Sequence, residues 1–214
     1  MKALTFWFDV ISPFAYLAFE RLPAVLADAA VAVSYQPVLF AGLLDHWGSK
    51  GPAELAPKKA WTFRHVAWLA AEHGIAFDLP ARHPFNPLPL LRAAWACAPM
   101  GGTVERSVCA RLFHHVWRGG HAADEPRRLA ELIAALPVQR DPAGDEVKHQ
   151  LRAATDAAIA RGVFGVPSFE LDGRTFWGVD ALPMLAQALT GDAWFDGPAW
   201  AAAAALEASA ERRR

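Results

Sequence analysis

The stretch that decides the fold is FDVISPFAYL, residues 8–17. The apolar run Leu4–Phe8 that leads into it is too short for a buried helix and predicts a strand that is apolar on both faces. Ser12 is a favoured helix N-cap and Pro13 a favoured first helical residue, and apolar residues then recur at helical spacing as far as Leu22. The sequence therefore predicts a strand that turns directly into a helix, with a serine at the turn.

Further strands are expected on either side of a long central segment. Val31–Leu39 alternates well enough to be a second strand, and Pro37 places it at an edge or near its end. Two β-rich runs, Ser168–Leu171 and Arg174–Trp177, are separated by Asp172-Gly173. Because Asp-Gly favours the tight turns of hairpins, we expect a β-hairpin there.

The central segment has the spacing of helices and almost no strand signal. Helices are expected at Pro57–Gly74, Leu88–Ala98, Val104–Gly119, Pro126–Leu136 and Asp145–Arg161, with two more after the hairpin at Leu182–Leu189 and Pro198–Glu211. This order predicts an α/β, thioredoxin-like fold with a large all-helical insertion. The thioredoxin-like domain would be discontinuous, over residues 1–40 and 161–214, and the inserted helical domain would cover residues 41–160.

Composition excludes several classes of function. With a net charge of −1 and scattered basic residues, the chain has no electrostatic footprint for nucleic acid. It lacks an apolar run of roughly 20 residues and a signal peptide, so we expect no membrane span and a cytoplasmic location. Cys97 and Cys109 are too far apart for a redox motif and, like the nine tryptophans, are expected in the core. No His/Cys cluster has metal-ligand spacing, so no metal is predicted.

Four stretches together carry a family resemblance. They are, in order, FDVISPFAYLA, Pro57-Lys58-Lys59-Ala60-Trp61, HPFNPLPLLRAAW and RGVFGVPSFELDGRTFWGVDALPML, and they resemble the 2-hydroxychromene-2-carboxylate isomerase family, a relative of kappa-class glutathione transferases and DsbA-like proteins. The similarity extends to about Leu189. The resemblance implies glutathione as cofactor and a small aromatic substrate.

The resemblance assigns the catalytic role to Ser12. In this family the serine at that position touches the sulfur of bound glutathione. A hydroxyl at a helix N-terminus can donate a hydrogen bond to a thiolate, and the helix dipole favours the same negative charge. The alternative is that Ser12 only caps the helix.

Two further segments are implied to bind glutathione. Val166-Pro167 resembles the family's cis-proline step, at which the backbone of Val166 would pair with the cysteinyl backbone of glutathione. The stretch Trp177-Gly178-Val179-Asp180 is similar to the segment that holds the γ-glutamyl end, with Asp180 accepting from the α-ammonium group. The alternatives are a trans proline that begins a strand and an aspartate that caps a helix.

The implied substrate-binding residues lie in the insertion. Lys58 matches a family lysine that approaches the anionic end of the substrate, and Phe85 and Asn86 match a loop that lines the pocket. A junction between two domains is a usual place for such a pocket. The alternative for Lys58 is a solvated first helical turn.

The resemblance implies glutathione-assisted isomerisation of an unsaturated aromatic acid in aromatic catabolism. With serine at 12 and alanine at 15, the turn cannot form a disulfide of its own. Two other functions stay open: a kappa-like glutathione transferase, and a DsbA-type binding or chaperone protein without catalytic thiols. The resemblance also allows for a homodimer.

Overall fold

The computed structural model of the chain describes residues 1–207 and contains a four-stranded mixed sheet. The strand order is β2-β1-β3-β4, and the strands are β1 (Lys2–Phe8), β2 (Val31–Pro37), β3 (Ser168–Leu171) and β4 (Arg174–Trp177). β1 pairs in parallel with β2 and antiparallel with β3. The expected strands are confirmed, and Pro37 is the last residue of an edge strand, where its missing N–H costs no ladder bond.

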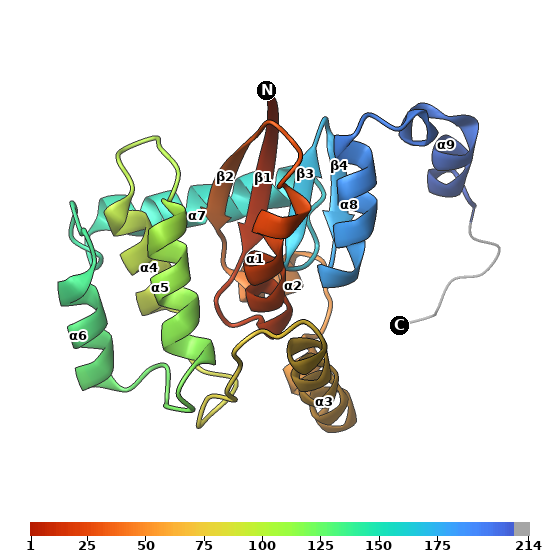
Figure 1. Cartoon of the computed structure of the whole chain (residues 1–214). Helices are drawn as coiled ribbons and strands as arrows, with labels where there is room; N and C mark the ends of the chain where they lie inside the picture. The colour runs from red at the N-terminus through yellow and green to blue at the C-terminus, as the bar shows by residue number, and fades with distance from the viewer. Residues whose placement is uncertain (208–214) are drawn as a thin grey trace.

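Helix α1 (Pro13–Val25) makes the crossover between the parallel strands. Figure 1 shows α1 and α8 (Leu182–Leu189) in front of the sheet, and α1 also contacts α3 and α5. Helix α7 packs against β2. The sheet is therefore covered by helices that come from both ends of the chain.

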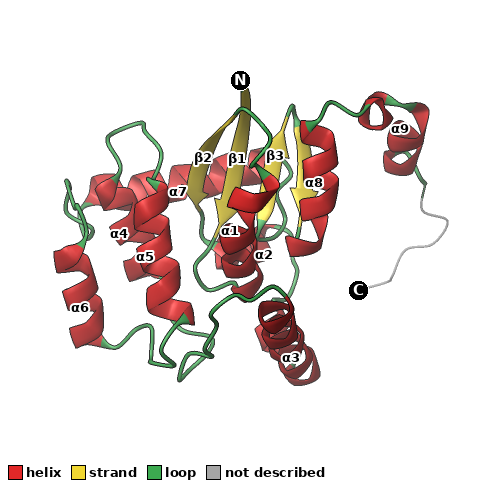
Figure 2. Ribbon diagram, in the orientation of Figure 1, coloured by secondary structure: helices red, strands yellow, loops and turns green. Residues whose placement is uncertain are grey.

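The remaining helices surround this centre, as the red elements of Figure 2 show. They are α2 (Phe40–His46), α3 (Ala56–Glu72), α4 (Leu88–Cys97), α5 (Arg106–Trp117), α6 (Pro126–Ala135), α7 (Asp145–Ala160) and α9 (Pro198–Ala204), with 3₁₀ turns η1 (Pro52–Glu54), η2 (Val179–Ala181) and η3 (Ala193–Asp196). The expected helices are confirmed to within two or three residues, whereas α2 and the 3₁₀ turns were not expected. The final helix is shorter than predicted, and positions 208–211 of that prediction lie outside the described residues. Among the described residues no helix is both long and apolar enough to cross a bilayer.

Aromatic side chains from neighbouring strands form the centre of the core. The Phe6 ring stacks on Phe169 of β3, with centroids 4.8 Å apart and planes 10° apart, and on Phe8 at 5.3 Å. All three side chains are fully buried. One hydrophobic cluster continues from this stack into the helices of residues 41–160, whose status as a separate domain stays a prediction.

The two cysteines are confirmed as buried core residues. Cys97 ends α4 with 5% of its surface exposed, and Cys109 lies fully buried within α5. Burial raises the pKa of both thiols, since it disfavours the charged thiolate.

The expectation that the tryptophans pack in the core is wrong for more than half of them. Five of the nine are between 44% and 66% exposed: Trp47, Trp61, Trp68, Trp177 and Trp194. Helical spacing places such residues on one face of a helix, but it does not say whether another element covers that face. Two of the buried tryptophans donate to the backbone near the ends of strands, Trp95 to the Pro37 carbonyl and Trp117 to the Val10 carbonyl.

The Phe6–Phe169 stack should dominate the stability of the sheet. We expect Phe169→Ala to lower the free energy of unfolding by about 3–5 kcal/mol, because it leaves a cavity between two strands. The matched control is Phe164→Ala, at a position 45% exposed, which should cost less than about 1 kcal/mol. Urea denaturation of both variants measures the difference. Equal losses of unfolding free energy would contradict the central place of the Phe6–Phe169 stack in the core.

Candidate functional site

The turn between β1 and α1 is held by a buried carboxylate. Asp9 is fully buried; its Oδ1 accepts a hydrogen bond from the Ile11 N–H (3.0 Å) and its Oδ2 one from the Phe40 N–H (2.9 Å). The backbone N–H of Ser12 donates to the Asp9 carbonyl (3.1 Å). Asp9 therefore ties the end of β1, the serine turn and the start of α2 together.

Burial also changes how Asp9 titrates. It raises the pKa of the carboxyl group from 3.8 to about 7, and the hydrogen bonds from Phe40 and Ile11 oppose this shift only in part. The Asp9 carboxyl thus titrates near neutral pH. It lies three residues before Ser12.

The hydroxyl of Ser12 connects the two predicted parts of the site. Its Oγ accepts from the N–H of Ala15 (3.2 Å) and donates to the carbonyl oxygen of Val166 (3.2 Å). The Val166-Pro167 peptide bond is cis, as predicted from the sequence. Ser12 is therefore a helix cap and, at the same time, a direct neighbour of the Val166 backbone.

Asp180 is linked to this pair through the backbone. The N–H of Gly178 donates to the carbonyl of Pro167 (2.9 Å), and Gly178 has a φ of +100°, in the region that favours glycine. A Cβ at Gly178 would strike the Asp180 carboxylate, which folds back over it. Asp180 is exposed and is neither a helix cap nor paired with any described residue, whereas Val179 is buried. The contacts thus do not support the capping interpretation of Asp180.

An exposed aromatic pair stands beside the Val166 backbone. Trp177 is 53% exposed and packs against Phe164, with ring centroids 4.8 Å apart. The indole covers Gly165, where an added Cβ would lie only 2.6 Å from Nε1. A larger residue at 165 would displace the indole, so the position of Trp177 requires glycine there.

The loop before α4 reaches the serine turn through His83, a residue not expected in the site. The Nε2–H of His83 donates to the carbonyl of Ile11 (2.9 Å), and Nζ of Lys59 donates to the carbonyl of His83 (2.5 Å). Lys58, which was predicted to bind substrate, lies exposed on the first turn of α3. Within residues 1–207 its side chain forms no hydrogen bond or ion pair with this loop. The neighbouring Lys59 is thus the lysine that contacts this loop, and a substrate role for Lys58 stays a prediction.

His83 lies in an aromatic environment. Its ring meets those of Phe63, Phe85 and Trp117 at centroid distances of 5.0, 5.9 and 5.9 Å. Burial lowers the pKa of the imidazole, the bond to the Ile11 carbonyl opposes this, and the charge of Lys59 adds to it. Its Nδ1 is buried and has no partner among the described residues.

The other two predicted substrate residues differ in their placement. Phe85 is buried beside His83. Asn86 is exposed, and its Oδ1 accepts from the N–H of Leu88, at the start of α4. The structure therefore brings Phe85 to the serine turn through His83, while the Asn86 side chain holds the first turn of a helix.

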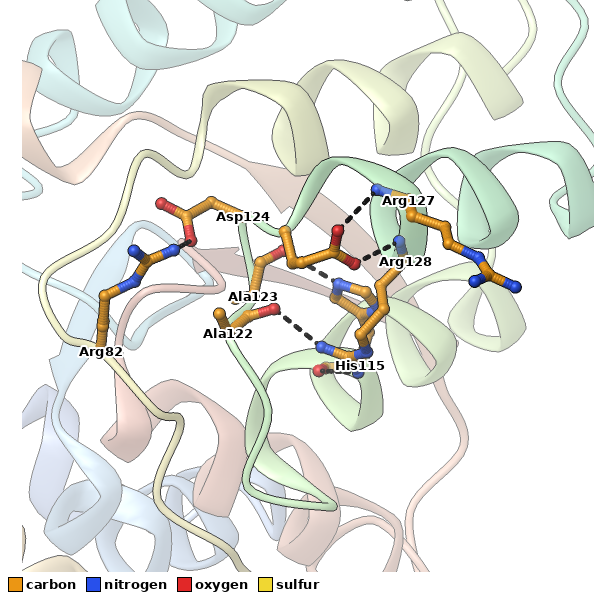
Figure 3. Close-up of polar contacts among 8 residues, drawn as sticks. Arg82, His115, Ala122, Ala123, Asp124, Arg127 and Arg128 are labelled. Atoms are coloured by element: carbon orange, nitrogen blue, oxygen red, sulfur yellow. Dashed lines mark hydrogen bonds and ion pairs between the residues drawn. The ribbon is translucent and has the colours of Figure 1, made fainter.

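The segment between α5 and α6 anchors the same loop from the other side (Figure 3). Arg82 pairs with Asp124 (3.2 Å), whose segment is fixed by hydrogen bonds from His115 to the Ala123 carbonyl (3.0 Å) and from Arg128 to the Ala122 carbonyl (2.8 Å). The Ala81 N–H also donates to the His121 carbonyl. These contacts fix the loop that carries His83 to the segment between α5 and α6.

Asp180 also borders a cavity of about 460 Å³ on the α8 side. Its other lining residues are Pro183, Met184, Gln187, Trp194 and Phe195. Ser12 and Val166 do not line it. Of the seven predicted glutathione contacts, Asp180 alone lines this cavity, and its connection to Ser12 and Val166 runs through the backbone.

Comparisons with known proteins agree with this fold. Residues 3–190 match the family described as DSBA-like thioredoxin domain. The chain is 29% identical over 197 residues to a 2-hydroxychromene-2-carboxylate isomerase of Sphingobium xenophagum (86% of this chain, 96% of the relative). It is also 29% identical over 217 residues to glutathione S-transferase kappa 2 of Caenorhabditis elegans (92% and 95%). A solved 2-hydroxychromene-2-carboxylate isomerase superposes with a TM-score of 0.73 at 25% identity, over 91% of this chain and 97% of that one.

The raised pKa of Asp9 has a consequence for stability. Folded protein keeps this proton up to about pH 7 and unfolded protein releases it near pH 3.8, so the Asp9 contribution to the free energy of unfolding falls as the pH rises through that window. The slope is at most about 1.4 kcal/mol per pH unit. Urea denaturation from about pH 4 to about pH 8 should show this slope in the wild type and not in Asp9→Asn. If the free energy of unfolding changed with pH in the same way in the wild type and in Asp9→Asn, this would contradict a raised pKa of Asp9.

Proposed function

Because the chain belongs to the DsbA-like thioredoxin domain family, we propose that it is a glutathione-dependent isomerase of the 2-hydroxychromene-2-carboxylate type. The proposed substrate is an unsaturated aromatic acid, and the proposed setting is aromatic catabolism in the cytoplasm. The observation that carries the proposal is the hydrogen bond between the Ser12 hydroxyl and the Val166 carbonyl. It places a hydroxyl at a helix N-terminus beside a backbone edge, in a turn without cysteine.

The residues present fit glutathione. The N–H of Val166 has no acceptor among the described residues, so its backbone can pair with an extended peptide. The carboxylate of Asp180 is exposed and unpaired within residues 1–207 and can accept from an ammonium group. We propose Ser12, Val166, Pro167, Trp177, Gly178, Val179 and Asp180 as the glutathione contacts, with Val179 contributing only its backbone because its side chain is buried.

Bound glutathione would supply a thiolate that adds reversibly to a conjugated double bond and so permits rotation about it. The role of Ser12 is to favour that thiolate. Its hydroxyl, which donates to the Val166 carbonyl here, would donate to the sulfur instead, and the carbonyl would then be free to accept from the peptide ligand. A hydrogen bond to a charged group is worth about 1.5–3 kcal/mol, which lowers the thiol pKa by about one to two units.

On the substrate side we assign the cationic role to Lys59 in preference to Lys58. The Lys59 ammonium uses one donor on the His83 carbonyl and keeps the others for a substrate carboxylate. Lys58 lies on the exposed side of the same helix. Phe85, beside His83, and Asn86 remain the proposed residues of the neighbouring loop.

A kappa-type glutathione transferase is the second candidate, favoured by the similarity to the Caenorhabditis elegans protein over 92% of the chain. The two activities differ in their products. Chromatography coupled to mass spectrometry, after incubation with glutathione and an unsaturated aromatic acid, should find a product that separates from the substrate but has the same mass. A conjugate that carries glutathione would support the transferase instead.

The cofactor assignment is tested by titrating glutathione into the protein in a calorimeter and by measuring isomerisation with and without it. We expect saturable binding and a reaction that requires glutathione. Turnover at the same rate without glutathione, or the absence of heat on titration, would overturn the proposal.

Replacing Ser12 should separate activity from binding. We expect Ser12→Ala to reduce turnover about tenfold to a hundredfold while glutathione affinity changes much less, because the hydroxyl acts on the charged sulfur. Ultraviolet absorbance of the bound thiolate against pH should show a raised thiol pKa. Ser12→Thr keeps a hydroxyl and is the control. If the alanine variant keeps both the thiol pKa and the turnover, Ser12 is only a helix cap.

Asp180→Ala should have the opposite effect. Without this carboxylate the ammonium group of glutathione loses its partner, so we expect affinity to fall about tenfold or more while the bound thiol stays acidic. Asp156→Ala, at an exposed aspartate on α7, serves as the control. Unchanged calorimetric affinity in Asp180→Ala would remove Asp180 from the site.

A further inference from the structure

The cavity of about 460 Å³ that borders Asp180 lies between α8 and the turn η3. In Figure 1 this is the part of the molecule where the chain leaves α8 and continues to α9. The volume falls in the range of about 300–1,000 Å³ that is usual for small-molecule sites. Apart from Asp180, none of its lining residues is a proposed glutathione or substrate contact, so the proposed reaction gives this cavity no role.

Helix α8 supplies one wall of the cavity through its outward side. Leu182 and Leu185 of this helix are buried. Pro183, Met184 and Gln187 are exposed and line the cavity. The Met184 side chain is 42% exposed, and its thioether is a polarizable surface that packs well against aromatic rings. This wall is therefore apolar apart from the amide of Gln187.

The turn η3 supplies a second wall with two aromatic rings. Phe195 is 3% exposed, whereas Trp194 is 48% exposed. The two rings meet edge to face with centroids 5.2 Å apart, and Trp194 also meets Trp200 of α9 at 5.7 Å. These contacts hold the Trp194 indole in place while much of its surface stays open to a ligand.

The charges at this cavity are mostly negative. Asp180 is the only charged residue of its lining, and the Asp180 carboxylate has no hydrogen-bond or ion-pair partner within residues 1–207. Asp192 accepts a hydrogen bond from the amide of Gln187 (2.5 Å). Asp196 pairs with Arg174, which leaves that arginine compensated. The cavity should therefore repel an anion and attract a cation.

We propose that the cavity binds an organic ammonium ion with an apolar body, such as an arylalkylamine. The Asp180 carboxylate would accept hydrogen bonds from the ammonium group, and the Trp194 indole and the Met184 thioether would cover the apolar part. An aromatic face also attracts a cation. A neutral aromatic molecule would cover the Asp180 carboxylate without pairing it, which is unfavourable. The proposal does not depend on the glutathione chemistry.

Calorimetric titration with 2-phenylethylamine tests the proposal against two compounds of similar shape. We expect saturable binding of the amine, which carries a positive charge at neutral pH. Neutral 2-phenylethanol should bind at least about tenfold more weakly, because the charge-assisted hydrogen bond is lost. Anionic 3-phenylpropionate should bind more weakly still. The absence of saturable amine binding would overturn the proposal, and so would equal affinity for the alcohol.

Two substitutions at Gln187 test the charge of the cavity without disturbing the core. Gln187→Lys introduces a cation that can pair with Asp180, so we expect the amine to bind about tenfold more weakly. Gln187→Glu adds a carboxylate of the same size as the amide, and this variant should bind the amine at least as tightly as the wild type. Equal amine affinity in the two variants would contradict the proposal.

Replacement of Trp194 tests the aromatic wall. Trp194→Ala should weaken amine binding about tenfold, and Trp194→Phe, which keeps an aromatic face, should retain most of the affinity. Trp61→Ala is the control, because it removes an indole that is 66% exposed on α3. Circular dichroism establishes that each variant is folded. Unchanged amine affinity in a folded Trp194→Ala variant would overturn the proposal.

Competition with glutathione separates this inference from the proposed function. The proposed function places the ammonium group of glutathione on the same Asp180 carboxylate, so the amine should raise the apparent dissociation constant of glutathione. The amine should do so much less in Trp194→Ala. Amine binding without competition would support the cavity site and remove Asp180 from the glutathione contacts. If glutathione itself gives no heat, the proposed function fails, while amine binding still supports the cavity site.

Discussion

The hydrogen bonds that one buried carboxylate accepts are the constraint on which the candidate site depends. Asp9 joins the N–H groups of Ile11 and Phe40, which are far apart along the chain but adjacent at the end of β1. These bonds fix the backbone before and after the crossover. His83 and Trp117 of the insertion bond the carbonyls of Ile11 and Val10 in the same turn, so contacts from both parts of the chain let the first turn of α1 present Ser12 to Val166. Burial raises the pKa of the Asp9 carboxyl, and the hydrogen bonds from the two N–H groups lower it. These opposing effects explain why an acidic residue can occupy this position.

Most elements of the fold could be predicted because each is specified by a continuous pattern. The apolar strand before Ser12, the Asp-Gly hairpin and the long helices depend on neighbours in sequence, and their expected positions are confirmed. The environment of the tryptophans could not be predicted in the same way. Helix α3 has apolar residues on two sides, and only the folded chain shows that Val66 faces the core while Trp61 and Trp68 face outward.

The candidate site could be predicted only in part, because its residues come from segments that are far apart in the sequence. Ser12 and the cis peptide at Val166 are 154 residues apart, and family resemblance supplied both. His83 opens the motif HPFNPLPLLRAAW, yet the sequence assigned no role to it or to Lys59, since their contacts are with the backbone of distant segments, Ile11 and His83 respectively. A histidine between arginine and proline in a loop has no periodic pattern. Asp9 did interrupt an apolar run, and that interruption was the one available sign of a buried polar role.

The burial of Cys97 and Cys109 has a consequence for the chemistry that this scaffold can tolerate. Their thiols are shielded by the core and kept protonated, so neither offers the nucleophile that disulfide exchange or oxidation to sulfenic acid requires. A small thiol brought to the serine turn would meet no competing sulfur in the protein. Oxidants that inactivate enzymes through an exposed cysteine would find no target here, and the fold would keep its covalent structure across a wide range of cellular reduction potentials.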